Sequence, residues 1–210
     1  MSVLDAIRRA PLLAQPPLAI AVDAVVFACF LLVALAVIAD FRAFYRQERG
    51  VTKAANSWVE TGSMTAFAIV YYLAVRFGLL GVALPDAWRT PTLLVGLALM
   101  VLGAVFNVLG RVYLSANWAN QIRVYEGASL VTRGPFALVR HPLYASLIWM
   151  FVGGSLVYAN GSAMLLTFGV FVPMMYVRAK KEDALLAEAF GDEFESYCRR
   201  TGMLLPRPPR

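Results

Sequence analysis

The chain has 210 residues, of which 60% are hydrophobic and 15% charged, and its formal net charge is +6. A soluble domain of this length would be much more polar, so the composition excludes an ordinary soluble protein and favours one integral membrane domain over residues 1–210. Cys29 lies in the first apolar stretch and Cys198 near the C-terminus, too far apart in the predicted topology to suggest a disulfide. One histidine cannot build a His-rich metal site, so no metal centre is expected.

Five apolar stretches are candidates for membrane-spanning helices, since a spanning helix needs about 20 mostly apolar residues. In chain order they are Leu18–Ala39, Trp58–Leu80, Thr92–Leu114, Leu143–Tyr158 and Ala163–Val177. The first is too long for the core of a signal peptide and is expected to be retained. Only Ala159–Ser162 separates the last two, which are short, so a tight helical hairpin is expected there. The fold is therefore predicted to be an all-α membrane protein with about five transmembrane helices.

The third stretch carries a repeat of small residues. Gly96, Gly103 and Gly110 recur every seven residues and place a smooth strip on one helix face. Small residues let neighbouring helices approach closely in lipid, so this strip predicts a packing surface.

Two short helices are expected after the fifth stretch. Lys180–Phe190 has apolar residues at helical spacing and is predicted to be an amphipathic helix that ends at Gly191. Asp192–Glu195 has the pattern of a capping-box variant that opens a second short helix. Together they would form a helical cap at the C-terminal end.

The basic residues are distributed unevenly between the two sides of this predicted topology. The segments after the first, third and fifth stretches carry Arg42, Arg46, Arg49, Lys53, Arg123, Arg133, Arg140, Arg178, Lys180, Lys181, Arg199, Arg200, Arg207 and Arg210. The opposite side carries Arg89 and the pair Arg8-Arg9. The positive-inside rule then places the N-terminus outside and the C-terminus in the cytoplasm, as in a bacterial inner membrane or an equivalent one. Because basicity here encodes orientation and contact with anionic lipid headgroups, nucleic-acid binding is not expected.

The single histidine lies where the fourth stretch begins. Proline is tolerated in the first turn of a helix, so Pro142 marks the start, with Arg140 and His141 just before it and Tyr144 one turn inside. Such residues are common interfacial anchors. The positive end of the helix dipole would also suit an anionic or polar ligand. The local sequence leaves both interpretations open.

An acidic pair, Glu182 and Asp183, directly follows the fifth stretch. Because the fourth and fifth stretches form a hairpin, the end of the fifth should lie beside the start of the fourth. His141 and Tyr144 are therefore expected to face the acidic pair at one membrane interface. An acid near a helix C-terminus opposes the dipole at a cost of about 0.3–1 kcal/mol per charge, which either basic neighbours or a ligand would offset.

The order of these motifs resembles the isoprenylcysteine carboxyl methyltransferase family, which belongs to a wider group that includes the phospholipid N-methyltransferases. The resemblance extends from about Asn107 to Pro206 and rests on "LVTRGPFALVRHPLY", the hairpin, the acidic pair and "FGDEFESYCRR". The departures from the family pattern keep the shape or charge that cofactor binding needs. They are Phe136 and Phe194 in place of tyrosine, Asp183 in place of glutamate, and Ser146 in place of glycine.

The resemblance implies that S-adenosylmethionine is the methyl donor and S-adenosylhomocysteine the product. No glycine fingerprint of a soluble nucleotide-binding fold occurs, so a membrane-specific pocket is expected. The residues implied to enclose the cofactor are Leu130, Val131, Thr132, Gly134, Pro135, Arg140, His141, Tyr144, Glu182, Asp183, Phe194, Tyr197 and Arg200. Glu182 would accept from ribose hydroxyls or the methionine ammonium, and Arg140 or Arg200 would pair with the methionine carboxylate.

The resemblance also implies an arginine for acceptor binding on the third span, ahead of an asparagine-aromatic pair. If Asn117-Trp118 is that pair, the arginine position falls on Asn107, and Arg111 lies four residues later on the same helix face. Either Arg111 takes the role or the acceptor differs, so the catalytic candidates are Arg111, Asn107 and Asn117. Residues 91–210 would then be the catalytic part and residues 1–90 the N-terminal spans.

The implied acceptor is a lipophilic molecule that enters from the bilayer, with the carboxylate of a prenylated cysteine as the leading candidate. An anionic carboxylate needs no general base, whereas the amine of a phospholipid headgroup, the first alternative, would need His141 or Glu182 as one. A non-enzymatic membrane scaffold or carrier is an alternative of another class. An NADPH-dependent membrane sterol reductase is a more distant one.

Overall fold

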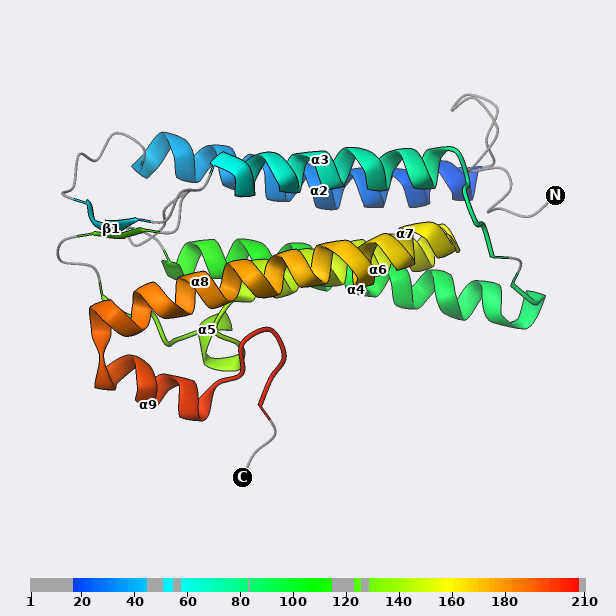
Figure 1. The fold of residues 1–210 in the computed structure, drawn as a ribbon. Coiled ribbons are helices and arrows are strands. Elements are labelled where there is room, and N and C mark those ends of the chain that lie inside the picture. The colour runs from blue at the N-terminus through cyan, green and yellow to red at the C-terminus, as the bar shows by residue number, and fades with distance from the viewer. Residues whose placement is uncertain are drawn as a thin grey trace.

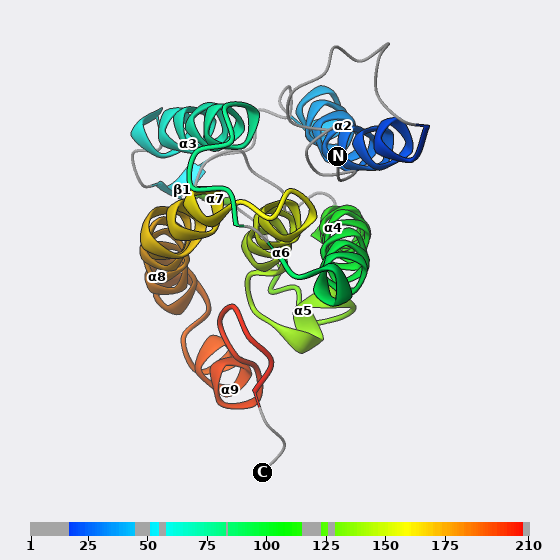
Figure 2. The same cartoon turned by 90° about the vertical axis from the view of Figure 1, so that its right-hand side faces the viewer.

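The long helices lie side by side as a bundle in the computed structural model, which describes residues 17–44, 51–54, 58–82, 84–114, 123–125 and 129–207. Helices α2 (Pro17–Phe44) and α3 (Trp58–Arg76) form one layer. Helices α4 (Asp86–Leu114), α6 (Pro142–Val157) and α8 (Val172–Phe190) form the other. Figures 1 and 2 show this arrangement from the side and along the bundle.

The shorter elements gather mainly at one end of the bundle, where α4 and α8 end and α6 begins (Figure 1). They are α5 (Pro135–Leu138), α9 (Asp192–Arg200) and two strands, β1 (Val51–Ala54) and β2 (Arg123–Tyr125), which pair antiparallel. This small ribbon is the one addition that the described residues make to the helical fold expected from the sequence.

The helices agree with the predicted apolar stretches to within a few residues at most ends. Three helical segments are long and apolar enough to cross a membrane: Pro17–Asp40, Asp86–Leu114 and Gly161–Phe190. Helix α3 has 19 residues and α6 has 16, and neither meets that measure of length and composition. The helical membrane character is therefore confirmed, while a count of five spans stays a prediction.

The expected hairpin between the fourth and fifth stretches is present. Its turn contains Ala159, whose φ of 44° lies in the left-handed region. Asn160 then caps α7 (Gly161–Leu166), because its side-chain oxygen accepts from the Ala163 N–H at 2.8 Å. The Asn160 amide also donates to the Ala74 carbonyl at 3.1 Å, which fixes the hairpin to the end of α3.

The helix after this turn is longer than the sequence indicated. It continues from α7 through a π-helical segment, η3 (Thr167–Phe171), and along α8 to Phe190, so the predicted separate helix at Lys180–Phe190 is wrong. No glycine or proline lies between Val177 and Lys180, so nothing there breaks the helix. The π-helical segment precedes Pro173, whose ring and missing N–H disfavour a regular α-helical turn at that point.

The helix boundary at Gly191 was predicted correctly, but the capping box after it was not. Gly191 has a φ of 50° and stands both at the end of α8 and at the N-cap of α9. Asp192 is therefore already the first helical residue, and no side chain caps α9.

The glycine strip of α4 packs against α6 as expected. A Cβ on Gly96 would lie 2.7 Å from the Gly153 carbonyl oxygen, and one on Gly103 would lie 2.7 Å from Met150 Cγ. A Cβ on Gly110 would lie 2.9 Å from a methyl group of Leu143. This close approach places Asn107, a polar residue of α4, directly against the first turns of α6.

Candidate functional site

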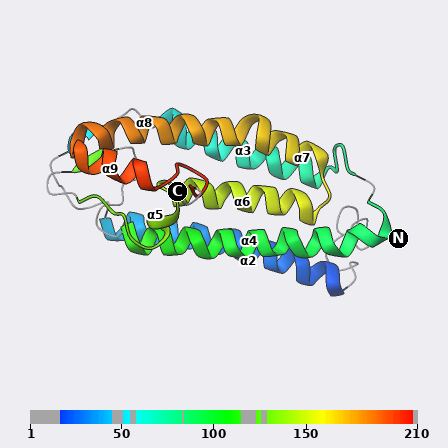
Figure 3. The same cartoon turned by 90° about the horizontal axis from the view of Figure 1, so that it is seen from below.

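The segment just before α6 is held by the C-terminal part of the chain. The Arg140 N–H donates to the Gly202 carbonyl at 2.8 Å, and the His141 N–H donates to the Met203 carbonyl at 3.1 Å. Figure 3 shows α9 and the segment that follows it lying close to the start of α6. Pro142 is the first residue of α6 and His141 its N-cap, as the sequence predicts.

His141 joins the start of α6 to the acidic pair on α8. Its Nε2 lies 2.7 Å from Asp183 Oδ1, and its Nδ1 lies 3.3 Å from Glu182 Oε2. The imidazole is 4% exposed and stacks on the ring of Tyr144, with ring centroids 5.5 Å apart. The predicted convergence of His141 with the acidic pair is therefore observed.

Tyr144 and two arginines complete this polar cluster. The Tyr144 hydroxyl donates to Glu182 Oε2 at 2.8 Å and accepts from Arg178 Nε at 2.9 Å. Arg140 Nη2 donates to Asp183 Oδ2 at 2.8 Å, and Arg140 Nη1 donates to the Thr201 carbonyl. We call Arg140, His141, Tyr144, Glu182 and Asp183, together with Arg178, the polar cluster.

The cluster holds its histidine in the charged form. Burial alone would lower the pKa of His141, but the hydrogen bonds to Asp183 and Glu182 and the attraction of their carboxylates outweigh it and raise the pKa to about 9. At neutral pH the cluster therefore sets three cations against two carboxylates. Glu182 is 34% exposed, so it is the acidic group most open to a ligand.

A second contact links α9 to α5. The Tyr197 hydroxyl donates to the Phe136 carbonyl at 2.6 Å, and burial raises the pKa of this phenol. Phe194 is also buried, 3% exposed, and packs edge-on against Tyr197. These two rings of α9 thus cover α5 beside the cluster. Arg200, an expected cofactor ligand, is exposed in the last turn of the same helix.

The connector before α5 contains a glycine that the backbone and its surroundings require. Gly134 has a φ of 61°, and a Cβ there would lie 2.6 Å from the ring of Tyr113, so only glycine fits. Pro135 begins α5 and is buried, while Leu130, Val131 and Thr132 are half-buried.

The acceptor candidates of α4 form a separate hydrogen-bonded row. Asn107 is fully buried and its Nδ2 donates to Ser146 Oγ at 2.8 Å. Arg111 Nε donates to Asn107 Oδ1 at 2.9 Å, which confirms that the two share a helix face. Arg111 Nη1 donates to Asp40 Oδ2 at 2.8 Å. Asp40 was not among the residues predicted from the sequence, and the third candidate, Asn117, lies outside the described residues.

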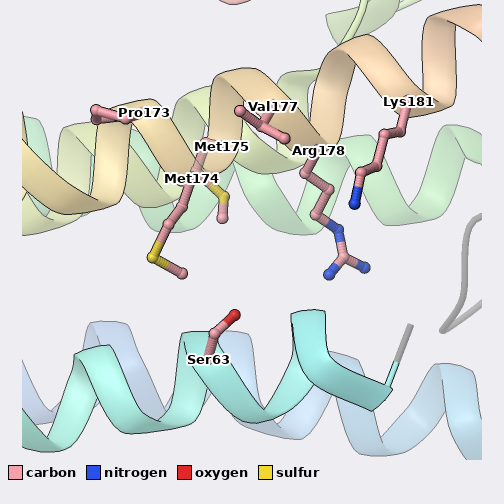
Figure 4. A pocket seen from close by; sticks show the side chains of 7 residues that line it. All are labelled: Ser63, Pro173, Met174, Met175, Val177, Arg178 and Lys181. Carbon is pink, nitrogen blue, oxygen red and sulfur yellow. The ribbon is translucent and has the colours of Figure 1, made fainter. Parts of the chain in front are cut away.

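A groove between α3 and α8 runs up to the polar cluster. It has a volume of about 330 Å³ and is mainly apolar. Figure 4 shows Met174 and Arg178 of α8 extending across the groove toward Ser63 of α3. The lining residues are Ser63, Pro173, Met174, Met175, Val177, Arg178 and Lys181. Arg178 belongs to both the groove and the cluster, since it also contacts Tyr144.

Comparison with known proteins gives a consistent result for the second half of the chain. The model of the isoprenylcysteine carboxyl methyltransferase (ICMT) family matches residues 94–188, which contain the polar cluster and the row on α4. A probable protein-S-isoprenylcysteine O-methyltransferase of Oryza sativa is 28% identical over 145 residues, which are 65% of this chain and 75% of the rice protein.

A bacterial relative is similar over a longer range. The cobalt-zinc-cadmium resistance protein CzcN of Cupriavidus metallidurans is 30% identical over 162 residues, which are 75% of this chain and 70% of that protein. Among the residues that the structure describes here, no group of three or more His, Cys, Asp and Glu side chains is placed to hold a metal ion.

The fold itself has a solved counterpart. The structure of the eukaryotic intramembrane Ras methyltransferase ICMT superposes with a TM-score of 0.63 and covers 97% of this chain and 71% of the other. The two sequences are 17% identical, so this likeness concerns the fold.

Proposed function

We propose that this chain, which belongs to the isoprenylcysteine carboxyl methyltransferase family, transfers a methyl group from S-adenosylmethionine to the carboxylate of a prenylated cysteine or a related lipophilic acid. Family membership makes it a membrane methyltransferase. The observation that carries the finer proposal is the convergence of His141 and Tyr144 with Glu182 and Asp183 at one end of the bundle.

The chemistry of the polar cluster fits S-adenosylmethionine, which carries ribose hydroxyls, an ammonium group and a carboxylate. Glu182 is the acidic side chain with the larger exposed fraction, and it would accept from hydroxyls or from the ammonium. Arg140, which contacts Asp183, would hold the carboxylate of the cofactor in a charge-assisted contact. When bound, the cofactor supplies a methyl group on a positively charged sulfur, which is an already activated donor.

The residues of the chain would then mainly orient the cofactor and the acceptor and exclude water. His141 holds both carboxylates in place through its two nitrogens, and Tyr144 fixes Glu182 from the other side. Phe194 and Tyr197 of α9 pack over α5 beside the cluster. Transfer to an acceptor carboxylate would form a C–O bond as the C–S bond of the donor breaks and its electron pair goes to sulfur, so no residue of the chain would have to move a proton.

A carboxylate acceptor fits the charge state of the cluster better than an amine. An amine must lose a proton before it attacks, and a general base is effective when its pKa lies near the working pH. His141 is already protonated at neutral pH because its pKa is raised to about 9. His141 is therefore poorly suited as the base that a phospholipid N-methyltransferase would need. The same holds for Glu182, because burial alone would raise its pKa but the hydrogen bond and charge of His141 outweigh burial and hold that pKa below its usual value.

The groove between α3 and α8 supports an acceptor with a long apolar chain. Its methionine and valine side chains suit a prenyl or acyl chain, and Arg178 places a positive charge where the groove meets the cluster. A lipophilic acid that enters from the bilayer would lay its apolar chain in this groove.

We further place the cluster end of the bundle on the cytoplasmic side, with residues 1–210 acting as one membrane domain. Arg133, Arg140 and the basic residues of α9 gather at this end, in keeping with the positive-inside rule. A water-soluble cofactor would then reach the cluster from the cytoplasm.

The function is tested by incubating membranes that contain the protein with methyl-labelled S-adenosylmethionine and a farnesylated cysteine whose amine is blocked and whose carboxylate is free. The expected product is a labelled ester that mild base hydrolyses, and the matching carboxamide should stay unlabelled. Label only in base-stable headgroup amines would contradict the proposed acceptor. Absence of S-adenosylhomocysteine binding by the purified protein would contradict enzymatic function.

A further inference from the structure

We propose that Asp40 is a positioning residue that acts through Arg111 on the carboxylate of the acceptor. The inference rests on the proposed function, because it assumes that Arg111 faces an anionic acceptor. Asp40 lies on α2, outside the segment 94–188 that the family model matches. It would therefore give this chain a contribution to the acceptor site that comes from its N-terminal part.

The contact geometry fixes the guanidinium of Arg111 on two sides. Asp40 Oδ2 accepts from Nη1 at 2.8 Å, and Asn107 Oδ1 accepts from Nε at 2.9 Å. Asn107 is itself fixed, because its Nδ2 donates to Ser146 Oγ at 2.8 Å. These contacts use two of the five N–H groups of the guanidinium, so further donors remain for a planar anion such as a carboxylate.

Stability alone does not explain this ion pair. The side chains of Arg111 and Asp40 are 11% and 13% exposed, and they lie near the ends of two helices that are apolar enough to cross a membrane. Removing two charges from water costs several kcal/mol per ion, and apolar residues of the same size often hold helices together equally well. Ionisable residues inside a membrane bundle are for this reason commonly functional.

The charge of Asp40 matters because the acceptor loses its own charge during the reaction. A free carboxylate is anionic, whereas the methyl ester is neutral, so an unopposed arginine would bind the ground state more strongly than the transition state. Asp40 offsets part of the positive charge of Arg111 and also fixes its orientation. The pair would thus bind the acceptor in the right place without holding it too tightly.

The test is the steady-state kinetics of Asp40→Asn with labelled S-adenosylmethionine and the farnesylated cysteine described above. Without the carboxylate, the guanidinium of Arg111 loses one contact that orients it, and its positive charge is no longer partly offset. We therefore expect kcat to fall about tenfold while KM for the acceptor stays equal or falls. Arg111→Ala should instead raise that KM. Asp40→Glu keeps the charge and should recover part of kcat.

Asp23→Asn is the matched control, since Asp23 also anchors α2. It accepts a hydrogen bond from the Tyr158 hydroxyl at 2.9 Å near the opposite end of the helix. If Asp40 only docked α2, both variants would lower kcat alike. The proposal expects the change in kcat and KM from Asp40→Asn alone, with S-adenosylhomocysteine affinity unchanged in both.

The outcomes separate this inference from the proposed function. An active wild-type protein in which Asp40→Asn changes neither kcat nor KM, or raises KM alone, would overturn the role of Asp40 and leave the function standing. A wild-type protein that transfers no methyl group would overturn the function. In that case the role of Asp40 is tested by equilibrium binding of the farnesylated cysteine. Tighter binding by Asp40→Asn than by the wild type supports the charge effect, and unchanged binding refutes it.

Discussion

Replacing His141 by glutamine tests the electrostatics of the polar cluster. Glutamine retains a side-chain N–H donor for Asp183 but carries no charge at any pH. In the wild-type protein the imidazole is 4% exposed and lies within 3.3 Å of both carboxylates. The variant therefore removes the cation that holds the acidic pair and leaves most of the packing in place.

The magnitude follows from the pKa of His141, which the folded protein raises from 6.5 to about 9. That difference corresponds to about 3 kcal/mol in favour of the protonated, folded form. Because the folded pKa is the higher one, this contribution is complete below pH 6.5 and is lost as the pH rises through about 9. At pH 7.5 about 2 kcal/mol of it should remain.

The assay is the free energy of unfolding in mixed micelles, measured for the wild-type protein and His141→Gln between pH 6 and pH 10. The difference between the two should be about 3 kcal/mol at the acid end and close to zero at the alkaline end. Other groups that titrate in this range affect both proteins and cancel in the difference. The same difference at every pH would refute the argument, because it would mean that the histidine contributes packing and no charge.

Two further predictions concern packing and the groove. Gly103→Ala places a Cβ 2.7 Å from Met150 Cγ and 2.9 Å from the Ser146 carbonyl oxygen, so it should destabilise the fold by about 1–3 kcal/mol. Gly169→Ala is the control and should be close to neutral, because nothing lies within 4 Å of a Cβ there. Equal unfolding midpoints for the two variants would contradict the close approach of α4 and α6. Met174→Trp should fill the groove between α3 and α8 and raise KM for the farnesylated acceptor about tenfold without changing S-adenosylhomocysteine affinity. Leu165→Trp, at a position 67% exposed, is the control, and an unchanged KM in Met174→Trp would separate the groove from the acceptor.

The part of the site that could be predicted from sequence depends on local signals. Pro142 fixes the start of α6, and the short turn at Ala159 and Asn160 requires two antiparallel neighbours. Those two facts bring His141 beside Glu182 without knowledge of any other helix. The same reasoning placed Asn107 and Arg111 on one face of α4, because residues four apart on a helix are neighbours.

Features that depend on which helices pack together, or on how a helix is rotated, are not contained in these local signals. Asp40 is an isolated acid at the end of an apolar helix, and only the packing of α2 on α4 brings it to Arg111. The position of Arg200 depends on the rotation of α9, which turns Phe194 and Tyr197 inward and leaves the arginine exposed. The continuity of α8 was missed because the change from apolar to charged residues at Arg178 resembles a helix end, although nothing there interrupts the backbone.

Calorimetric titration of S-adenosylhomocysteine into the purified protein is the most direct test of the polar cluster as the cofactor site. The wild-type protein should bind, and Glu182→Gln should bind at least about tenfold more weakly, because a charged acceptor for the cofactor is lost. Asp192→Asn changes an exposed acid at the start of α9 and should bind like the wild type. Equal affinity in Glu182→Gln and the wild type would show that the cofactor is held elsewhere.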